Sequence, residues 1–205
     1  MRVVEHSVKL LFITPNALEL IEQAGRTCYK SEDKITPSSS EKFVNMLITK
    51  KHESVLEHAY ASLRVITDRG VSHEAVRHRI ASYSQESTRY CNYNKGKHGS
   101  EITVIKPLGL TVEQEVLWRE ACETSEKIYM QLIDAGVPPQ TARYVLPISL
   151  KTEFVWTANF REWRTILKQR CSAAAHPHMR EIASRIRTIL IVMYPPIFED
   201  TLEVK

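Results

Sequence analysis

Apolar and polar residues alternate along three stretches of the chain, as they do in strands that bury one face. These stretches cover residues 8–12, 60–67 and 150–158. A shorter apolar run at 102–105 predicts a further strand. The pattern therefore predicts short strands at four well-separated places in the chain.

Between and after these strands, apolar residues recur every three or four positions, which predicts helices. Capping residues and prolines mark where most of the helices begin. The expected helices start at Asn16, at the capping boxes Ser38-x-x-Glu41 and Thr111-x-x-Gln114, at Ser72, at Pro139, at Asn159 and at Met179. The helix after Ser72 is expected to carry His73 to His78. We expect an α+β fold with a mainly antiparallel sheet flanked by helices.

Composition supports a single folded domain over residues 1–205. Hydrophobic residues make up 43% and charged residues 25% of the chain, which are ordinary globular values. The net charge of +4 is spread along the chain, which favours small anionic ligands over nonspecific coating of nucleic acid. Charged residues interrupt the apolar amino terminus, so we expect neither a signal peptide nor a membrane span, and a cytoplasmic protein.

The cysteines and histidines give little support for a metal site or a disulfide framework. The four cysteines are far apart and form no Cys-x-x-Cys pair, which indicates reduced thiols. His52 and His58 are six residues apart and lack the spacing that aligns ligands on one helix face. His176 and His178 lie near Cys171 without a fourth ligand in the sequence nearby. We therefore expect no metal.

Hydrogen-bond donors are concentrated in the stretch from Arg77 to Asn92, which holds three arginines, a histidine, three serines and a glutamine within its first thirteen residues. Such donors can hold a ligand with a phosphate and a heterocycle edge. A solvated basic turn is the simpler interpretation of an arginine-rich stretch. Here, however, Ile80, Tyr83 and Tyr90 interrupt the donors, as in a partly buried pocket wall.

The triplet Arg77-His78-Arg79 with Ser87 after seven residues resembles the signature of flavin-dependent thymidylate synthases, and Arg89-Tyr90 continues it. Further segments resemble this family in the same order along nearly the full length. They are Ala24-Gly25-Arg26-Thr27-Cys28, His52-Glu53-Ser54, Ser84-Gln85, the run from Ala142 to Pro147, Asn159-Phe160-Arg161 and Arg170.

The resemblance implies two sets of binding residues. The FAD contacts it implies are Cys28, His52, Ser54, Arg77, His78, Arg79, Gln85, Asn159, Arg161 and Thr165. The dUMP contacts it implies are Glu74, Arg77, Gln85, Glu86, Ser87, Thr88, Arg89, Arg143 and Arg170. Arg170 is also the implied catalytic residue, because a guanidinium held against the uracil edge can stabilise negative charge on the ring.

By the same resemblance, the protein is expected to convert dUMP to dTMP, with 5,10-methylenetetrahydrofolate as carbon donor and NADPH as reductant of FAD. It is also expected to form a homotetramer. No cysteine lies in a recognisable nucleophile setting, so no thiol is expected to attack the pyrimidine. A basic RNA- or DNA-binding module and a non-catalytic helical interaction domain are the alternatives, and either would be colourless on purification.

Overall fold

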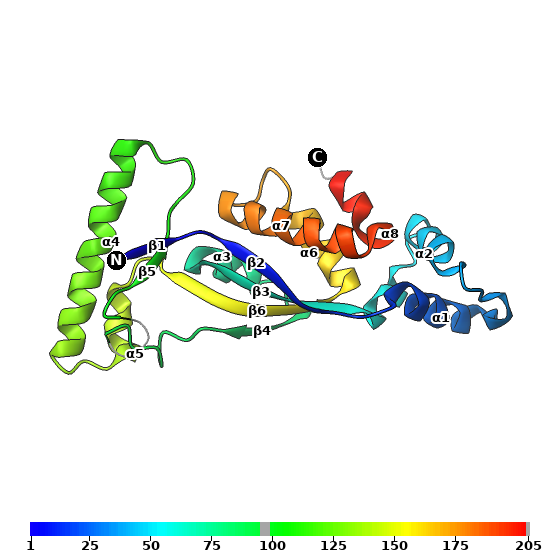
Figure 1. The fold of residues 1–205 in the computed structure, drawn as a ribbon, viewed down its shortest axis with the longest axis horizontal. Helices are drawn as coiled ribbons and strands as arrows, with labels where there is room; N and C mark the ends of the chain where they lie inside the picture. Colours follow the sequence, from blue (N-terminus) through cyan, green and yellow to red (C-terminus); the bar gives the residue numbers. More distant parts are fainter. Residues whose placement is uncertain (95–98, 204–205) are drawn as a thin grey trace. The chain divides into compact units, whose positions relative to one another are not determined.

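The computed structural model describes residues 1–94 and 99–203, and the chain forms two compact units. Unit 1 comprises Met1–Ser7, Val65–Arg77 and Ser84–Phe154. Unit 2 comprises Val8–Arg64, His78–Tyr83 and Val155–Lys205. Figure 1 labels the elements of both units along the sequence. The assignment of residues 1–205 to a single domain stays a prediction.

The main sheet has four strands in the order β2-β3-β6-β4, and each unit contains part of it. The strands are β2 (Ser7–Ile13), β3 (Tyr60–Asp68), β6 (Lys151–Asn159) and β4 (Ala81–Gln85). Partners across β3 and β6 run in opposite directions, since Ser62 meets Thr157 while Ala59 meets Phe160. The predicted α+β class with a mainly antiparallel sheet is confirmed.

Strand β4 was not predicted, because its sequence, Ala-Ser-Tyr-Ser-Gln, is short and has only two apolar residues. It is the last strand in the sheet order, so within residues 1–94 and 99–203 one of its edges has no neighbouring strand. Its residue Tyr83 packs against Trp156 of β6, with ring centroids 5.6 Å apart. Tertiary packing, more than its own sequence pattern, therefore accounts for the formation of this strand.

Aromatic side chains form much of the core of unit 2. Trp156 and Trp163 lie with ring centroids 5.0 Å apart, and Phe160 meets Phe198 edge-on at 5.2 Å. The helices around them are α1 (Ala17–Tyr29), α2 (Ser40–Thr49), α6 (Phe160–Arg170), α7 (Pro177–Met193) and α8 (Pro195–Phe198), with the 3-10 turn η2 (Glu53–His58). Contacts between aromatic rings therefore form a central part of the packing in this unit.

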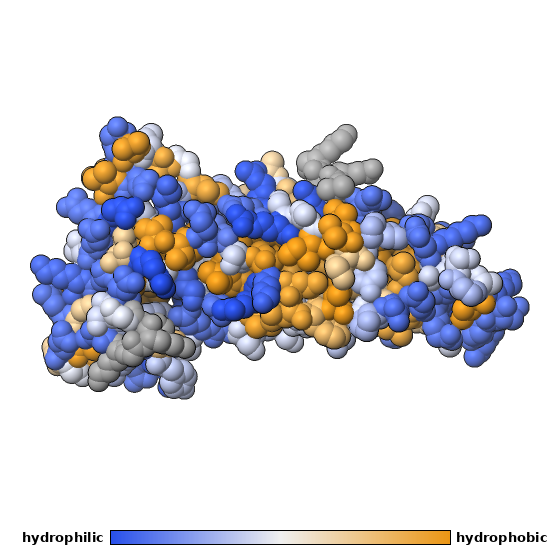
Figure 2. Space-filling view, in the orientation of Figure 1, coloured by the Kyte–Doolittle hydropathy of each residue, from blue (hydrophilic) through white to orange (hydrophobic). Residues whose placement is uncertain are grey.

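Unit 2 also exposes apolar side chains on its part of the sheet. Phe12 and Tyr60 stack at 5.3 Å between ring centroids, although each is 45% exposed, and the neighbouring Leu11 is 48% exposed. Figure 2 shows apolar residues gathered along β2 on the face that it presents.

Unit 1 contains the long helix α4 (Val112–Asp134) and the shorter helices α3 (Arg69–Ala75) and α5 (Pro139–Ala142). A two-stranded parallel sheet joins β1 (Arg2–Val4) to β5 (Thr103–Ile105). Its core comprises Tyr93, Ile102, Val104, Cys122, Tyr129, Ala142 and Leu150.

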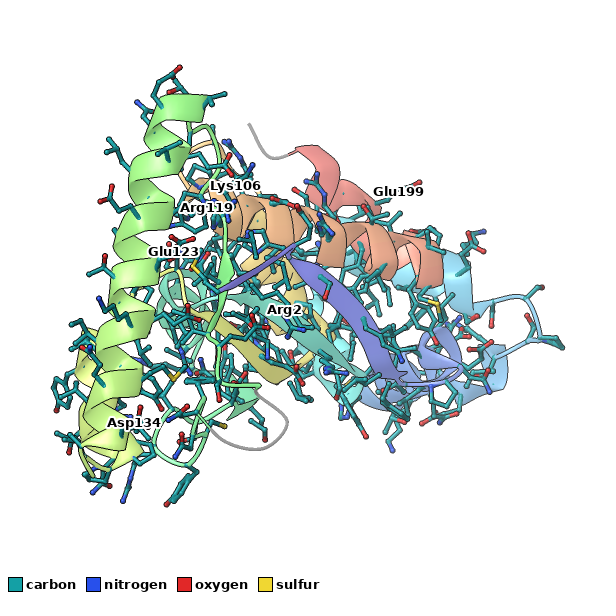
Figure 3. All side chains as sticks on the ribbon, turned by 60° about the vertical axis from the view of Figure 1, so that its left-hand side comes forward. Arg2, Lys106, Arg119, Glu123, Asp134 and Glu199 are labelled. Atoms are coloured by element: carbon teal, nitrogen blue, oxygen red, sulfur yellow. The ribbon has the colours of Figure 1, made fainter. Side chains whose placement is uncertain are left out.

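Two predicted features of α4 are confirmed. Thr111 and Gln114 form the expected capping box, and the helix stops before Gly136, whose φ of 85° favours glycine. Arg119 of the helix and Lys106, which precedes it, both pair with Glu115, and Figure 3 labels the two basic residues beside α4.

Three predicted helix starts are wrong or displaced. Helix α3 begins at Arg69 because the Asp68 side chain accepts from the Val71 N–H, while Ser72 lies inside the helix. The capping box predicted at Ser38 does not form, since α2 begins at Ser40. Helix α7 begins at Pro177, where proline suits the first helical position.

Within the described ranges, every helix is too short or too polar to cross a bilayer.

Candidate active site

The Arg77-His78-Arg79 triplet lies beyond the end of α3, not on the helix as predicted. The chain leaves the helix through a bond from the Arg77 N–H to the Glu74 carbonyl. Arg77 and Arg79 are exposed, whereas His78 is only 6% exposed. The triplet therefore presents two guanidinium groups to solvent and turns its imidazole into unit 2.

His78 connects the two ends of helix α6. Its Nε2 accepts a hydrogen bond of 3.0 Å from Nε of Arg170, in the last turn of the helix. Its Nδ1 faces Oε1 of Glu162, in the first turn, at 3.5 Å. The Tyr83 hydroxyl donates to the His78 carbonyl at 3.0 Å, and the Trp156 ring lies 6.0 Å away. Both ring nitrogens thus face side chains of α6, while Tyr83 holds the backbone of His78.

This environment keeps the imidazole neutral. Burial, with a smaller contribution from the positive charge of Arg170, lowers the pKa of His78 from its usual 6.5 to about 4. Because Arg170 can only donate, Nε2 must accept, so the proton of the neutral ring sits on Nδ1. Burial also raises the pKa of Glu162. The arrangement places one fixed positive charge, that of Arg170, next to a neutral acceptor.

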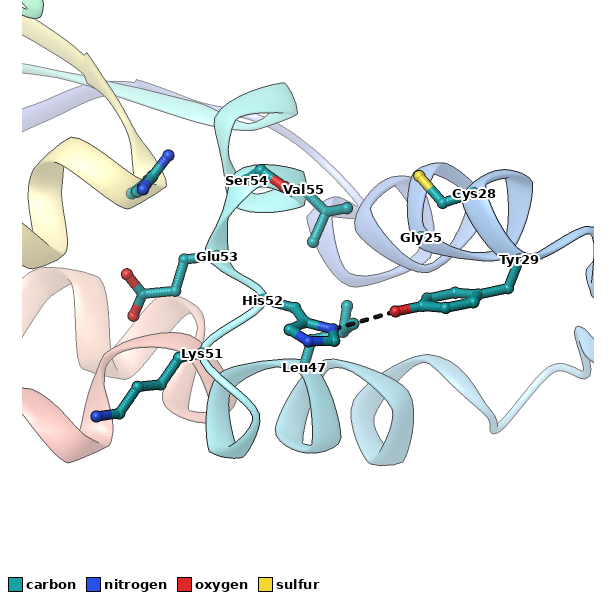
Figure 4. Close-up of a pocket in the computed structure, with 10 residues that line it drawn as sticks. Gly25, Cys28, Tyr29, Leu47, Lys51, His52, Glu53, Ser54 and Val55 are labelled. Carbon is teal, nitrogen blue, oxygen red and sulfur yellow. Dashed lines mark hydrogen bonds between the residues drawn. The ribbon is translucent and has the colours of Figure 1, made fainter.

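Four of the predicted flavin residues line one cavity in unit 2, with a volume of about 420 Å³ (Figure 4). They are Cys28 at the end of α1, His52 and Ser54 around the start of η2, and Arg161 on α6. Tyr29, which was not among the predicted residues, also lines this cavity, and its hydroxyl lies 3.2 Å from Nδ1 of His52. Its proximity to Cys28 in the sequence was the available signal.

A second cavity of about 390 Å³ in unit 2 brings together Asn159, Arg161 and Thr165. Asn159 caps α6 as predicted, by accepting from the Glu162 N–H at 2.8 Å. Arg161 lines both cavities and pairs with Glu57 at 2.6 Å. The two cavities therefore share one exposed guanidinium.

Thr88 and Arg143, two of the predicted nucleotide residues, line a cavity of about 430 Å³ in unit 1. Arg143 Nη1 donates to the Thr88 hydroxyl at 3.3 Å. Arg69 and His73 line the same cavity and were missed. His73 stands four residues before Arg77 in the sequence, which was the available signal for it. Three basic side chains therefore surround this cavity.

Other predicted nucleotide residues hold protein partners. Glu86 pairs with Lys151 at 2.7 Å and accepts from the Tyr93 hydroxyl at 3.2 Å. Gln85 donates to Thr152 at 3.0 Å. The Ser87 hydroxyl accepts from the Arg89 N–H. None of these four predicted residues lines the cavity that Thr88 and Arg143 share.

The predicted residues divide between the units by ligand. Every predicted dUMP residue except Arg170 belongs to unit 1. Every predicted FAD residue except Arg77 and Gln85 belongs to unit 2.

A family model described as "thymidylate synthase complementing protein" matches residues 9–196. The chain belongs to this family. Its curated relatives include the flavin-dependent thymidylate synthases of Geobacter sulfurreducens, 32% identical over 94% of this chain and 85% of the relative, and of Pyrococcus horikoshii, 34% identical over 86% and 75%. The predicted resemblance to flavin-dependent thymidylate synthases is confirmed.

Two solved structures share the fold of this flavin-dependent thymidylate synthase family member. Thymidylate synthase X from Helicobacter pylori, solved with FAD and dUMP, has a TM-score of 0.81 at 24% identity and covers 97% of this chain and 99% of its own. The UMP/dUMP methylase PolB from Streptomyces cacaoi, bound with 5-Br dUMP, has a TM-score of 0.82 at 22% identity, with 97% and 96% covered.

Proposed function

We propose that this protein is a flavin-dependent thymidylate synthase. It methylates C5 of dUMP to give dTMP, using 5,10-methylenetetrahydrofolate as carbon donor, NADPH as reductant and FAD as cofactor. The observation that carries the proposal is the fixed Arg170 guanidinium within a chain of this family. A cytoplasmic location stays part of the prediction.

The side chains of the two cavities in unit 2 suit FAD. A dinucleotide needs a cation for its pyrophosphate and neutral donors for its ring and sugar edges. Arg161 supplies the cation, while His52, Ser54 and Asn159 supply neutral polar groups. Exposed Arg79 would add a second cation. When bound and reduced, FAD supplies the electrons and mediates passage of the methylene carbon.

Arg170 would act on the nucleotide by charge. A pyrimidine becomes nucleophilic at C5 when negative charge is stabilised on its carbonyl oxygens and N3. A guanidinium stays protonated throughout the physiological range and presents donors in one plane, so it can face that ring edge. No thiol attack on the ring is then required.

The basic cavity of unit 1 suits a phosphate. Arg143 and Thr88 already lie within hydrogen-bonding distance of each other, so one phosphate oxygen could contact both. Arg77, Ser87 and Arg89 would complete the nucleotide contacts, with Glu74, Gln85 and Glu86 binding neutral donors of the nucleotide. Each of these roles is part of the proposal.

We also propose a homotetramer. The exposed Phe12–Tyr60 stack and Leu11 support self-association, because a large apolar group at 45% exposure or more gains free energy when another subunit covers it.

The decisive experiment reconstitutes purified protein with FAD and follows dTMP by mass spectrometry. We expect dTMP only when dUMP, methylenetetrahydrofolate, NADPH and FAD are all present, with bleaching of the yellow colour by NADPH. Formation of dTMP without FAD, or none in the complete mixture, would overturn the proposal. A colourless protein whose RNA binding weakens steeply with salt would favour the nucleic-acid module.

A further inference from the structure

The contacts of the buried His78 imidazole do not fit its predicted role as a flavin contact. Its Nε2 is engaged by Arg170 and its Nδ1 faces Glu162, so both ring nitrogens face protein groups. The side chain is 6% exposed. A flavin contact through either nitrogen would have to displace one of these two groups.

The bond from Arg170 fixes the direction of its guanidinium. Nε is the donor nearest the aliphatic stem, and anchoring it sets the plane in which the two terminal amino groups lie. An arginine side chain has several rotatable bonds, and Arg170 lies in the last turn of α6, where helices fray. An acceptor at Nε therefore restricts the side chain before substrate binds. Less conformational entropy then has to be lost when the guanidinium is aligned with the pyrimidine.

Glu162 faces the other ring nitrogen of His78. Its carboxylate faces Nδ1, so it favours the tautomer that leaves Nε2 unprotonated as an acceptor. Glu162 and Arg170 are eight residues apart on α6, about 12 Å along the axis. One imidazole reaches both of these positions, and the Trp156 ring of β6 lies beside it.

We propose that His78 is a positioning residue, held by Glu162, that orients the Arg170 guanidinium towards the pyrimidine and does not bind FAD through its ring. This proposal rests on the proposed function of Arg170. The arrangement joins a carboxylate, an imidazole and a guanidinium, and it acts on the orientation of the arginine without transferring a proton.

The test compares His78→Ala and His78→Gln with the wild type in FAD affinity, kcat and KM for dUMP. We expect His78→Ala to bind FAD with unchanged affinity and to lose kcat by about 10-fold to 100-fold, as misplacement of a catalytic group does. His78→Gln retains a side-chain acceptor and should recover part of kcat. In an Arg170→Ala background, His78→Ala should lower kcat no further.

Tyr83→Phe is the matched control, because it removes a hydroxyl that bonds the His78 backbone but leaves the Arg170 contact intact. We expect it to alter kcat far less than His78→Ala. Weaker FAD binding with unchanged kcat at saturating FAD would make His78 a flavin ligand and overturn the proposal. Unchanged FAD affinity and unchanged kcat in His78→Ala would also overturn it.

A readout without turnover separates this proposal from the proposed function. In ¹H–¹⁵N spectra of the flavin-free protein, the Arg170 Nε–H should exchange slowly in the wild type and rapidly in His78→Ala. Slow exchange in both would overturn the positioning role, even in an active enzyme. Absence of dTMP formation by the wild type would instead remove the proposed function.

Discussion

Arg164 of α6 binds Glu53, with Nη2 and Oε1 3.0 Å apart, and this pair ties the helix to the turn between His52 and Ser54. The same guanidinium also binds Asp200 and the Ile197 carbonyl. Arg164 is only 2% exposed, so these partners must compensate the free-energy cost of burying its charge. One lining residue of the cavity proposed for FAD, Glu53, is therefore held by a buried arginine, and Figure 4 labels it among the residues of that cavity.

Replacement of Arg164 by methionine should lower the free energy of unfolding by about 1 to 3 kcal/mol, because Glu53, Asp200 and the Ile197 carbonyl lose their shared hydrogen-bond donor. It should also weaken FAD binding by loosening the turn that carries His52. Urea unfolding and FAD titration measure the two effects. Lys168→Ala is the control, since Lys168 is exposed and only flanks Asp200 at 3.7 Å. Equal stability of the two variants would contradict the proposed anchoring.

Replacement of Arg170 by alanine should leave FAD bound and lower dTMP formation by about 100-fold or more, because the charge that activates the pyrimidine is lost. Arg170→Lys keeps a positive charge but lacks the planar fork, so it should recover only part of the rate. Absorbance of bound FAD and mass spectrometry of dTMP give the two readouts. A fully active Arg170→Ala enzyme would refute the mechanism.

Replacement of Arg79 by alanine should weaken FAD binding by about 10-fold, the size expected for one charge-assisted hydrogen bond. The kcat at saturating FAD should change little. Arg185→Ala is the matched control, since Arg185 is an exposed arginine of α7 that pairs with Glu181. Equal FAD affinity in both variants would remove Arg79 from the flavin site.

Cysteine variants should keep methylation activity. All four cysteines lie in described parts of the chain and are free thiols. Burial raises the pKa of Cys122 and of Cys171, which disfavours the nucleophilic thiolate. We expect Cys28→Ser, Cys91→Ser, Cys122→Ala and Cys171→Ser to form dTMP. A covalent adduct between the pyrimidine and any of these thiols, found by mass spectrometry, would contradict the charge mechanism.

The low pKa of His78 predicts how stability depends on pH. Between pH 6.5 and about 4 the unfolded chain protonates this histidine while the folded chain does not, so the free energy of unfolding falls as pH decreases. The loss reaches about 3 kcal/mol near pH 4. Unfolding at several pH values, compared with His78→Gln, isolates it. The neighbouring Glu162 titrates in the opposite sense, because burial raises its pKa, so the comparison is repeated with Glu162→Gln.

A constant stability difference between the wild type and His78→Gln from pH 7 to pH 4, in both Glu162 backgrounds, would show that His78 titrates normally in the folded protein.

The amino-acid sequence alone determined those elements that depend only on residues close together in the chain. The capping box of Thr111 and Gln114, the Asn159 cap and the alternation in β3 and β6 were all predicted, because each depends on neighbours a few residues away. Ser72 was the cap predicted for the helix that follows β3. The structure selects Asp68, whose carboxylate meets the Val71 N–H.

The arginine-histidine-arginine triplet and its family resemblance could be found in the sequence, but the different fates of its members could not. Arg77 and Arg79 face solvent, while His78 meets Arg170 across 92 positions of the chain. No periodicity encodes such a contact, because it depends on how β4 and β6 pack around Trp156. Sequence alone identified the cation that the chemistry needs. Only the tertiary structure supplied the buried neutral acceptor that orients it, because burial is what keeps that imidazole unprotonated.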